Sequence, residues 1–360
     1  MNSFFNGLEL KTLRQLHQLS LEDLSVKVSK SRQFLHKIEM NQVTPNEDLI
    51  EELCNFLNVD RNVFFTSHPL LQEDQINFRS NKTAKVATKQ SVIAQGEYLR
   101  RLVEFLDDHL RLPKYSILTS DSPDNFQDIE KAAYNFRKQF NLGLGPISDM
   151  TKLCEMLGII VTTFPSVSTE VDALSIASQR PIFINNETSS TCRQRFNLAH
   201  ELGHLVLHDG CITGDSITES QAHRFASALL IPQEMMVTHF KPCFNGRFNW
   251  SKLGEMKRAW KISKAALLYR AKSLGLLNED SYRSGVIHLK RTGEAISEIE
   301  DEDIPSEVPD LLPKCFKALE KKGITAVDVA SDLNISVNLL EKITQLKFSS
   351  GRKPILRLVT

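Results

Sequence analysis

Residues 196–208 read FNLAHELGHLVLH and place two histidines four positions apart, at His200 and His204. On a helix this spacing puts both imidazoles on one face, one turn apart. There they can bind one Zn²⁺ ion at about 2.0–2.1 Å. Glu201 is rotated by about 100° from His200, so it lies near the metal without having to bind it. The stretch therefore predicts a helical zinc site with Glu201 as its general base.

A third protein ligand is expected in the segment that follows, TESQAHRFASALLIP, at residues 218–232. Thr218 and Gln221 have the spacing of a capping box, so we expect a helix to begin there. Glu219 then lies in the first turn and completes a His₂Glu set that leaves one position open for water. His223, one turn later, is expected either to support a ligand from behind or to be a surface residue. The alternative is that the two histidines are ordinary polar positions of a surface helix.

The wider pattern is R-x-R-F-x-L-A-H-E-L-G-H-L-x-L-H, followed by E-x-x-A-x-x-F-A-x-x-L-L-x-P. It resembles the ImmA/IrrE family of zinc metallopeptidases, over about residues 126–285. At His223 the sequence departs from the family, which usually has Asn or Asp there. The resemblance implies three zinc ligands and one catalytic acid/base, which are in this order His200, His204, Glu219 and Glu201.

Three β-rich runs precede the predicted zinc helix and indicate an α+β unit, at 157–164, 171–177 and 180–185. They fit the ImmA/IrrE family too, as does the later helix at 262–277, and imply a zincin-like fold with a small sheet. Members of this family are similar to enzymes that cut a partner transcriptional repressor once, after a stress or mating signal. The candidates to stabilise a transition-state oxyanion are Tyr269, His208 and His223.

The first 68 residues predict a bundle of four or five short helices on one core. Leucines recur at three-residue steps from Leu10 to Leu19, and Ser20 can cap a second helix whose first turn carries two acids. Residues 10–59 resemble the XRE, lambda-repressor-like helix-turn-helix family along their full length. The resemblance implies that the third helix, SRQFLHKIE, enters the major groove of double-stranded operator DNA with its N-terminus first.

The candidate DNA contacts lie on this third helix and at its two ends. The first 66 residues carry seven Lys or Arg against nine Asp or Glu, and this negative net charge argues against DNA binding. However, residues 27–41 carry four Lys or Arg against one acid, so the docking face is positive. A bundle used only for protein contacts is the alternative. The base-facing candidates are Ser31, Arg32, Gln33 and His36, and the phosphate-contacting candidates are Lys30, Lys37 and Asn41.

Charge also marks two later segments. The whole chain has 44 Lys plus Arg against 44 Asp plus Glu, so any basic patch must be local. Between Ile76 and Arg101 there are six Lys or Arg and one acid, which predicts either extra phosphate contacts or a solvated helix. From Glu294 to Asp310 there are eight acids and no Lys or Arg, the composition of a solvated linker.

We therefore expect a multidomain, mainly α protein. No apolar run approaches the roughly 18 residues of a membrane helix. The six cysteines are scattered, which suits reduced thiols. We thus expect a cytoplasmic homodimer without membrane contact. Its parts are a helix-turn-helix domain (1–68), a basic helical connector (69–125), a zinc metallopeptidase domain (126–288), an acidic linker (289–313) and a small helical C-terminal domain (314–360) that packs against the rest or binds a partner.

Two functions compete on this evidence. In the first, the chain is a DNA-binding regulator whose Zn²⁺-dependent endopeptidase domain cleaves a regulatory protein partner, such as a repressor. In the second, it is a non-proteolytic transcription factor or antitoxin-like regulator whose peptidase-like domain senses a ligand or mediates dimerisation. Glu201 favours the first function, because a purely structural zinc site has no need of a general base.

Overall fold

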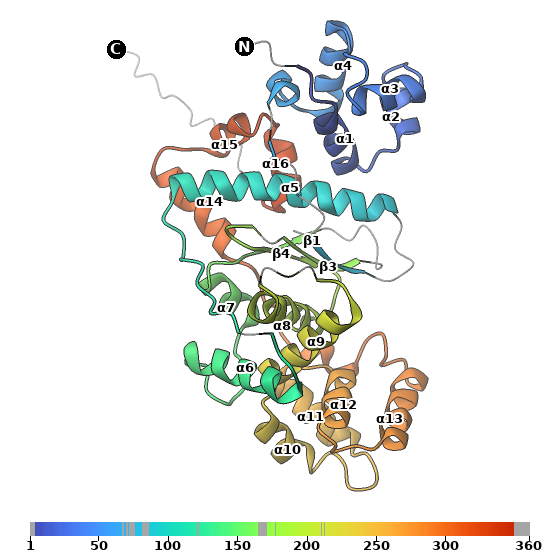
Figure 1. The fold of residues 1–360 in the computed structure, drawn as a ribbon, viewed down its shortest axis with the longest axis vertical. Coiled ribbons are helices and arrows are strands. Elements are labelled where there is room, and N and C mark those ends of the chain that lie inside the picture. The colour runs from blue at the N-terminus through green and yellow to red at the C-terminus, as the bar shows by residue number, and fades with distance from the viewer. Residues whose placement is uncertain are drawn as a thin grey trace, which may run out of the picture.

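A small sheet lies at the middle of the molecule, between a long helix above it and the predicted zinc helix below it (Figure 1). The computed structural model describes residues 4–66, 68–69, 71, 76–80, 86–120, 122–164, 171–176, 178–209, 211 and 213–348, with the backbone only at 77–80 and 171–172. The strands run in the order β1-β3-β4-β2. Strands β2 and β4 are parallel, and the other two pairs are antiparallel. Their bounds are β1 Ile76–Ser80, β2 Ile160–Phe164, β3 Val171–Ile176 and β4 Ile182–Asn186.

Alternation along the strands sends side chains into two different cores. Ile182 and Ile184 of β4 belong to the core beneath helix α5 (Val86–His109), whereas Phe183 belongs to the core around helix α8 (Thr191–Leu207). This is the period of two that every strand imposes. The three predicted runs are strands, so the expected α+β unit with a small sheet is confirmed. β1 is a fourth strand, and it comes from the segment that was expected to be a connector.

The N-terminal bundle has the predicted helix-turn-helix order. Ser20 caps α2 in a reciprocal capping box with Asp23, as its position in the sequence indicates. Leu10, Leu13 and Leu35 are fully buried at the centre. The elements are α1 Gly7–Leu16, α2 Leu21–Lys27, α3 Arg32–Glu39, α4 Glu47–Leu57 and the 3₁₀ helix η1 Arg61–Phe65.

Buried ion pairs fasten this bundle to α5. Both terminal nitrogens of Arg101 donate to the Glu9 carboxylate, at 2.9 and 2.8 Å, and the Tyr98 hydroxyl donates to the same group. Arg100 pairs with Glu97 at 2.7 Å. The expectation that these two arginines contact phosphate or water is therefore wrong. Three other basic residues of the stretch, Arg79 (side chain), Lys82 and Lys85, lie outside the described residues.

The lower half of the molecule is helical around the second core (Figure 1). Helices α8 and α9 pack against each other and against α6, so the predicted zinc helix is surrounded by protein. The elements are α6 Phe126–Gln139, α7 Met150–Met156, α9 Ser216–Leu230, α10 Gln233–Phe240, α11 Trp250–Trp260, α12 Lys264–Ser273 and α13 Glu279–Arg291.

The acidic segment, residues 294–310, is not a solvated linker. Lys257, whose side chain is 0% exposed, pairs with Glu298 at 2.7 Å and with Asp301 at 2.6 Å. Glu307 pairs with Arg195 of α8, and its carboxylate also accepts from the first backbone amides of α7. The prediction of solvation fails because basic side chains far away in the sequence neutralise these acids. The segment contains the 3₁₀ helix η3 Ile299–Asp303.

The C-terminal helices pack onto α5 and onto the N-terminal bundle, and they share its core. Asp60 N donates to Asn334 O at 2.9 Å, and Ser336 N donates to Asn58 O at 3.0 Å, so the two loops are joined by backbone hydrogen bonds. A helical C-terminal unit is thus present, while the five-part division remains a prediction. None of the helices described is long and apolar enough to cross a bilayer. The last elements are α14 Leu311–Lys321, α15 Ala326–Asp332 and α16 Val337–Thr344.

Candidate metal centre and DNA-binding face

Two helices present the predicted zinc ligands. Helix α8 begins at Thr191, directly after Ser190, whose side chain caps it. It carries His200 and His204, which have 4% and 5% of their surface exposed. Helix α9 begins earlier than predicted, because Asp215 is its cap and accepts from the amides of residues 217 and 218. The capping box expected from Thr218 and Gln221 is therefore wrong. Glu219 still lies in the first turn, facing α8.

Gly203 lets the two helices approach closely. A Cβ at this position would lie 3.1 Å from the Cα of Ala222 in α9 and 3.2 Å from the Phe225 ring. A side chain there would push α9 away from α8, and Glu219 would move with it. The small residue inside the zinc motif thus sets the distance between the helices that carry the ligands.

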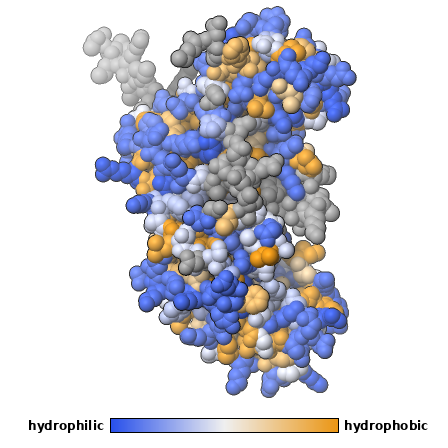
Figure 2. Space-filling model, in the orientation of Figure 1, coloured by the Kyte–Doolittle hydropathy of each residue, from blue (hydrophilic) through white to orange (hydrophobic). Residues whose placement is uncertain are grey.

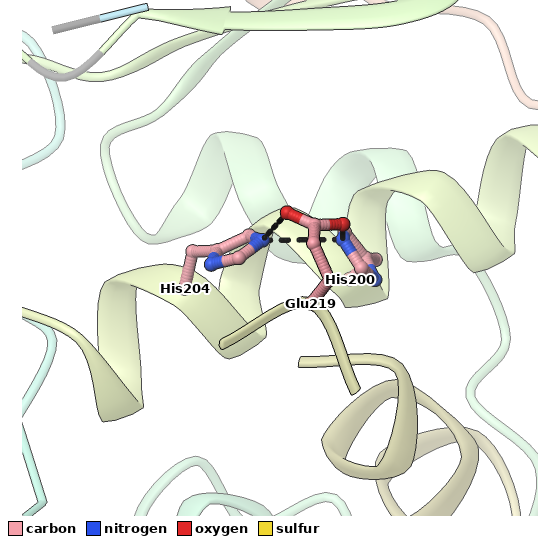
Figure 3. Close-up of side chains that lie close together, drawn as sticks. All are labelled: His200, His204 and Glu219. Atoms are coloured by element: carbon pink, nitrogen blue, oxygen red, sulfur yellow. Dashed lines mark hydrogen bonds and ion pairs between the residues drawn. The ribbon is translucent and has the colours of Figure 1, made fainter. Parts of the chain in front are cut away.

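The three candidate ligands converge on one point (Figure 3). The Nε2 atoms of His200 and His204 lie 3.2 Å apart, and each lies 3.2 Å from one oxygen of the Glu219 carboxylate. Among the described residues, these three form the group of His, Cys, Asp and Glu side chains suited to a metal ion.

A hydrogen-bonded chain behind His204 fixes which of its nitrogens carries the proton. Gln221 Oε1 can only accept, so His208 Nε2 donates to it, at 2.8 Å. Burial lowers the pKa of His208, so that ring is neutral and its Nδ1 accepts. His204 Nδ1, 3.0 Å away, must then be the donor. The Nε2 lone pair of His204 is left pointing at Glu219 and His200.

This arrangement fits a zinc ion. A lone pair that faces a carboxylate oxygen at 3.2 Å is repelled by it unless a cation lies between them. Two atoms bound tetrahedrally to one zinc ion at about 2.0–2.1 Å lie about 3.3 Å apart. Each of the separations observed here is 3.2 Å, with a different Glu219 oxygen facing each histidine. The Glu219 side chain is 45% exposed, so the ligand group is reached from the side of this residue. A donor set of two histidines and one glutamate leaves one tetrahedral position of a zinc ion open.

Glu201 stands apart from the three ligands. It is 4% exposed, and its carboxylate accepts a hydrogen bond from the hydroxyl of Ser175 on β3. Neighbouring residues of a helix point about 100° apart, so Glu201 is directed to the sheet while His200 is directed to Glu219. The sequence pattern gave no sign of Ser175, because the serine comes from a strand 26 residues away.

The three oxyanion candidates have different surroundings. His208 is 6% exposed and is hydrogen-bonded to His204 and Gln221, so it supports the candidate ligand His204 instead. The His223 ring packs against the rings of Tyr269, at 4.9 Å between centroids, and of Phe196, at 4.7 Å. Its centroid lies 6.3 Å from that of His200. His223 and Tyr269 therefore remain candidates beside the metal centre.

The predicted DNA contacts are exposed on the surface of the N-terminal bundle, residues 4–66, which we call the head. Figure 2 shows a mostly hydrophilic surface over this part of the molecule. Ser31 also caps α3, since its hydroxyl accepts from Phe34 N at 3.2 Å. Asn41 has an internal partner, because its Oδ1 accepts from Gly7 N at 2.7 Å and joins α3 to α1. The other candidates project freely toward solvent and are Lys30, Arg32, Gln33, His36 and Lys37.

Comparison with known families separates the chain into two recognised parts. Residues 154–272 match the IrrE N-terminal-like domain, a peptidase family. Residues 10–64 match the helix-turn-helix family. Both resemblances found in the sequence are thereby confirmed, in the same order along the chain. No curated protein matches the chain. The chain joins a helix-turn-helix domain of a DNA-binding type to an IrrE-like domain, which contains His200, His204 and Glu219.

Proposed function

We propose that this chain is a DNA-binding regulator whose IrrE-like domain is a zinc-dependent endopeptidase that cleaves a regulatory protein partner, such as a transcriptional repressor. The observation that carries the proposal is the arrangement of four side chains at α8. His200, His204 and Glu219 converge on one point, while a fourth group, Glu201, is buried beside them and held by Ser175. A structural metal site would not need this fourth group.

When bound, zinc would lower the pKa of a water molecule and polarise the scissile carbonyl. Glu201 would accept a proton from the attacking water and deliver it to the amine that leaves. The Ser175 hydroxyl would keep the carboxylate in place during both transfers. His223 and Tyr269, whose rings lie beside His200, are placed on the side where an oxyanion would need a donor.

The head would hold the peptidase at particular genes. Helix α3 presents Arg32, Gln33 and His36 to solvent, with Lys30 and Lys37 nearby. Arginine and glutamine side chains read base edges in the major groove, and lysines neutralise phosphates. Because helix-turn-helix heads of this type read two half-sites, we include a homodimer in the proposal.

The test is the substitution Glu201→Gln, which keeps the size of the side chain and the three ligands. Elemental analysis should find one zinc per chain in both the variant and the wild type. In cells of the source organism, mapping of protein N-termini should reveal a cleavage product that the wild type produces and Glu201→Gln does not. General-base loss commonly lowers rates roughly 10²–10⁴-fold.

Glu234→Gln, an exposed residue of α10, is the matched control and should behave as wild type. If cells with Glu201→Gln show the same N-termini and the same gene regulation as wild type, hydrolysis is not the function. The alternative then holds, in which the domain senses a ligand or mediates dimerisation without proteolysis.

A further inference from the structure

A hollow lies near the candidate ligand His200. It has a volume of about 340 Å³, within the usual range for pockets that bind small molecules or side chains. His223, Phe196 and Tyr269 belong to its lining. The same His223 ring faces the ring of the candidate ligand His200, 6.3 Å between centroids. The His223 ring therefore links the hollow to the ring of the candidate ligand His200.

Besides His223 of α9, the walls of the hollow come from three further parts of the chain. Phe196 and Cys192 belong to the first turns of α8, and Ala266 and Tyr269 belong to α12. The acidic segment closes the remaining side, with Ile296 among its lining residues. Ile296 is 95% exposed, so a bound apolar group would cover a side chain that water now surrounds. The packing of this segment against α11 and α12 thus creates the hollow.

Each of the three acids in the lining is held in an ion pair with a buried lysine. Glu298 and Asp301 pair with the buried Lys257, at 2.7 and 2.6 Å. Glu294 pairs with Lys264, whose side chain is 3% exposed. The cation in the lining, Arg193, is exposed to solvent, which screens its charge. What remains to recognise a ligand is chiefly apolar and aromatic surface.

We propose that this hollow is a subsite of the peptidase and holds an uncharged, apolar side chain of the substrate, next to the scissile bond. The inference rests on the proposed function. A peptide whose carbonyl lies at the metal centre has its nearest side chains within reach of the neighbouring hollow. Burying a Leu or Phe side chain there would add to the affinity, whereas a carboxylate would lose its hydration next to paired acids.

The test uses hydroxamates, because a hydroxamate group binds zinc without any need for cleavage. The probes are acetohydroxamate and the hydroxamates of N-acetyl glycine, leucine, phenylalanine and aspartate, titrated by calorimetry into the zinc-loaded full chain. The leucine and phenylalanine compounds should bind roughly 10- to 100-fold more tightly than the glycine compound. The aspartate compound should bind no more tightly than glycine.

Ala266→Phe should fill the hollow and remove this preference while acetohydroxamate still binds as in wild type. Ala87→Phe, on the exposed side of α5, is the control and should keep the preference. Equal affinities for all amino-acid hydroxamates in the wild type would overturn the subsite and leave the metal centre standing. If the zinc-loaded chain bound no hydroxamate at all, acetohydroxamate included, the proposed metal centre and the subsite would fall together.

Discussion

The Nδ1 atoms of His204 and His208 lie 3.0 Å apart, and His208 in turn donates to Gln221 at 2.8 Å. A metal-binding histidine commonly donates its second ring nitrogen to a carboxylate or a backbone carbonyl. Here a neutral histidine and an amide take that place, so the orientation of His204 depends on two further side chains. By contrast, His200 Nδ1 is buried without a hydrogen-bond partner among the described residues.

The hydrogen-bonded chain of His204, His208 and Gln221 predicts how substitutions change the affinity for zinc. His208→Leu removes the acceptor behind His204 and should weaken zinc binding roughly 10- to 100-fold. Gln221→Met removes the end of the chain and should have a smaller effect in the same direction. Gln221→Glu keeps an acceptor and should stay within a few-fold of wild type. Competition with a chromophoric chelator measures each constant, and equal affinities for all four proteins would refute the role of the chain.

The contact between Ser175 and Glu201 leads to a second prediction. Ser175→Ala leaves the three ligands intact but frees the carboxylate, so zinc affinity should be unchanged while cleavage slows roughly 10- to 100-fold. Ser175→Thr keeps a hydroxyl at this position and should restore most of the rate. The measurement is the rate on the partner identified by N-terminus mapping. An unchanged rate in Ser175→Ala would show that the serine does not position Glu201.

The convergence of the three candidate ligands could be predicted from the sequence, because it depends on spacing along two consecutive helices. His200 and His204 are one helical turn apart, and Glu219 opens the next helix. The capping role predicted for Gln221 is wrong. Its distance from Thr218 suits a capping box, but Asp215 caps the helix and Gln221 accepts a hydrogen bond from His208. Spacing within one helix does not show which neighbour a side chain will meet on another helix.

The sequence did not predict β1 or the packing of the acidic segment, because both depend on partners that are distant in the sequence. The five residues of β1 have little strand character alone, and they are a strand because β3 offers an edge. The acidic segment has the composition of a linker, and only Lys257, Lys264 and Arg195 on other helices make it part of a core. Apolar periodicity, by contrast, is local, and it correctly located the helix-turn-helix bundle and three strands.

The junction between the head and α5 gives a third prediction. Arg101, with 3% of its side chain exposed, pairs with Glu9 and Glu97, so Arg101→Met leaves two carboxylates in a buried site with less compensation. Removing one partner of a buried pair costs about 3–5 kcal/mol. Urea unfolding should show this loss. Arg61→Met breaks the exposed pair with Glu47 and should leave the unfolding midpoint unchanged. Equal midpoints for both variants would contradict the prediction.

The last prediction concerns the DNA-binding face. Arg32→Ala with Gln33→Ala removes two exposed side chains from α3 that can read base edges, so preference for the operator should disappear. Lys37→Ala removes a phosphate contact, so it should weaken binding to all sequences alike and reduce the salt slope by about 1. The operator is first selected from random DNA, and affinities are then measured over a range of salt concentrations. Lys131→Ala, exposed on α6, is the control and should change neither quantity.

A substitution at Asn41 distinguishes loss of a structural hydrogen bond from loss of a contact with DNA at the same face. Because its Oδ1 accepts from Gly7 N, Asn41→Ala should lower the unfolding midpoint of the protein, an effect that loss of a phosphate contact alone would not have. Its residual affinity should therefore follow the folded fraction. If the double variant of Arg32 and Gln33 bound the operator as tightly and as selectively as wild type, α3 would not be the reading helix, and the head would be a protein-contact bundle.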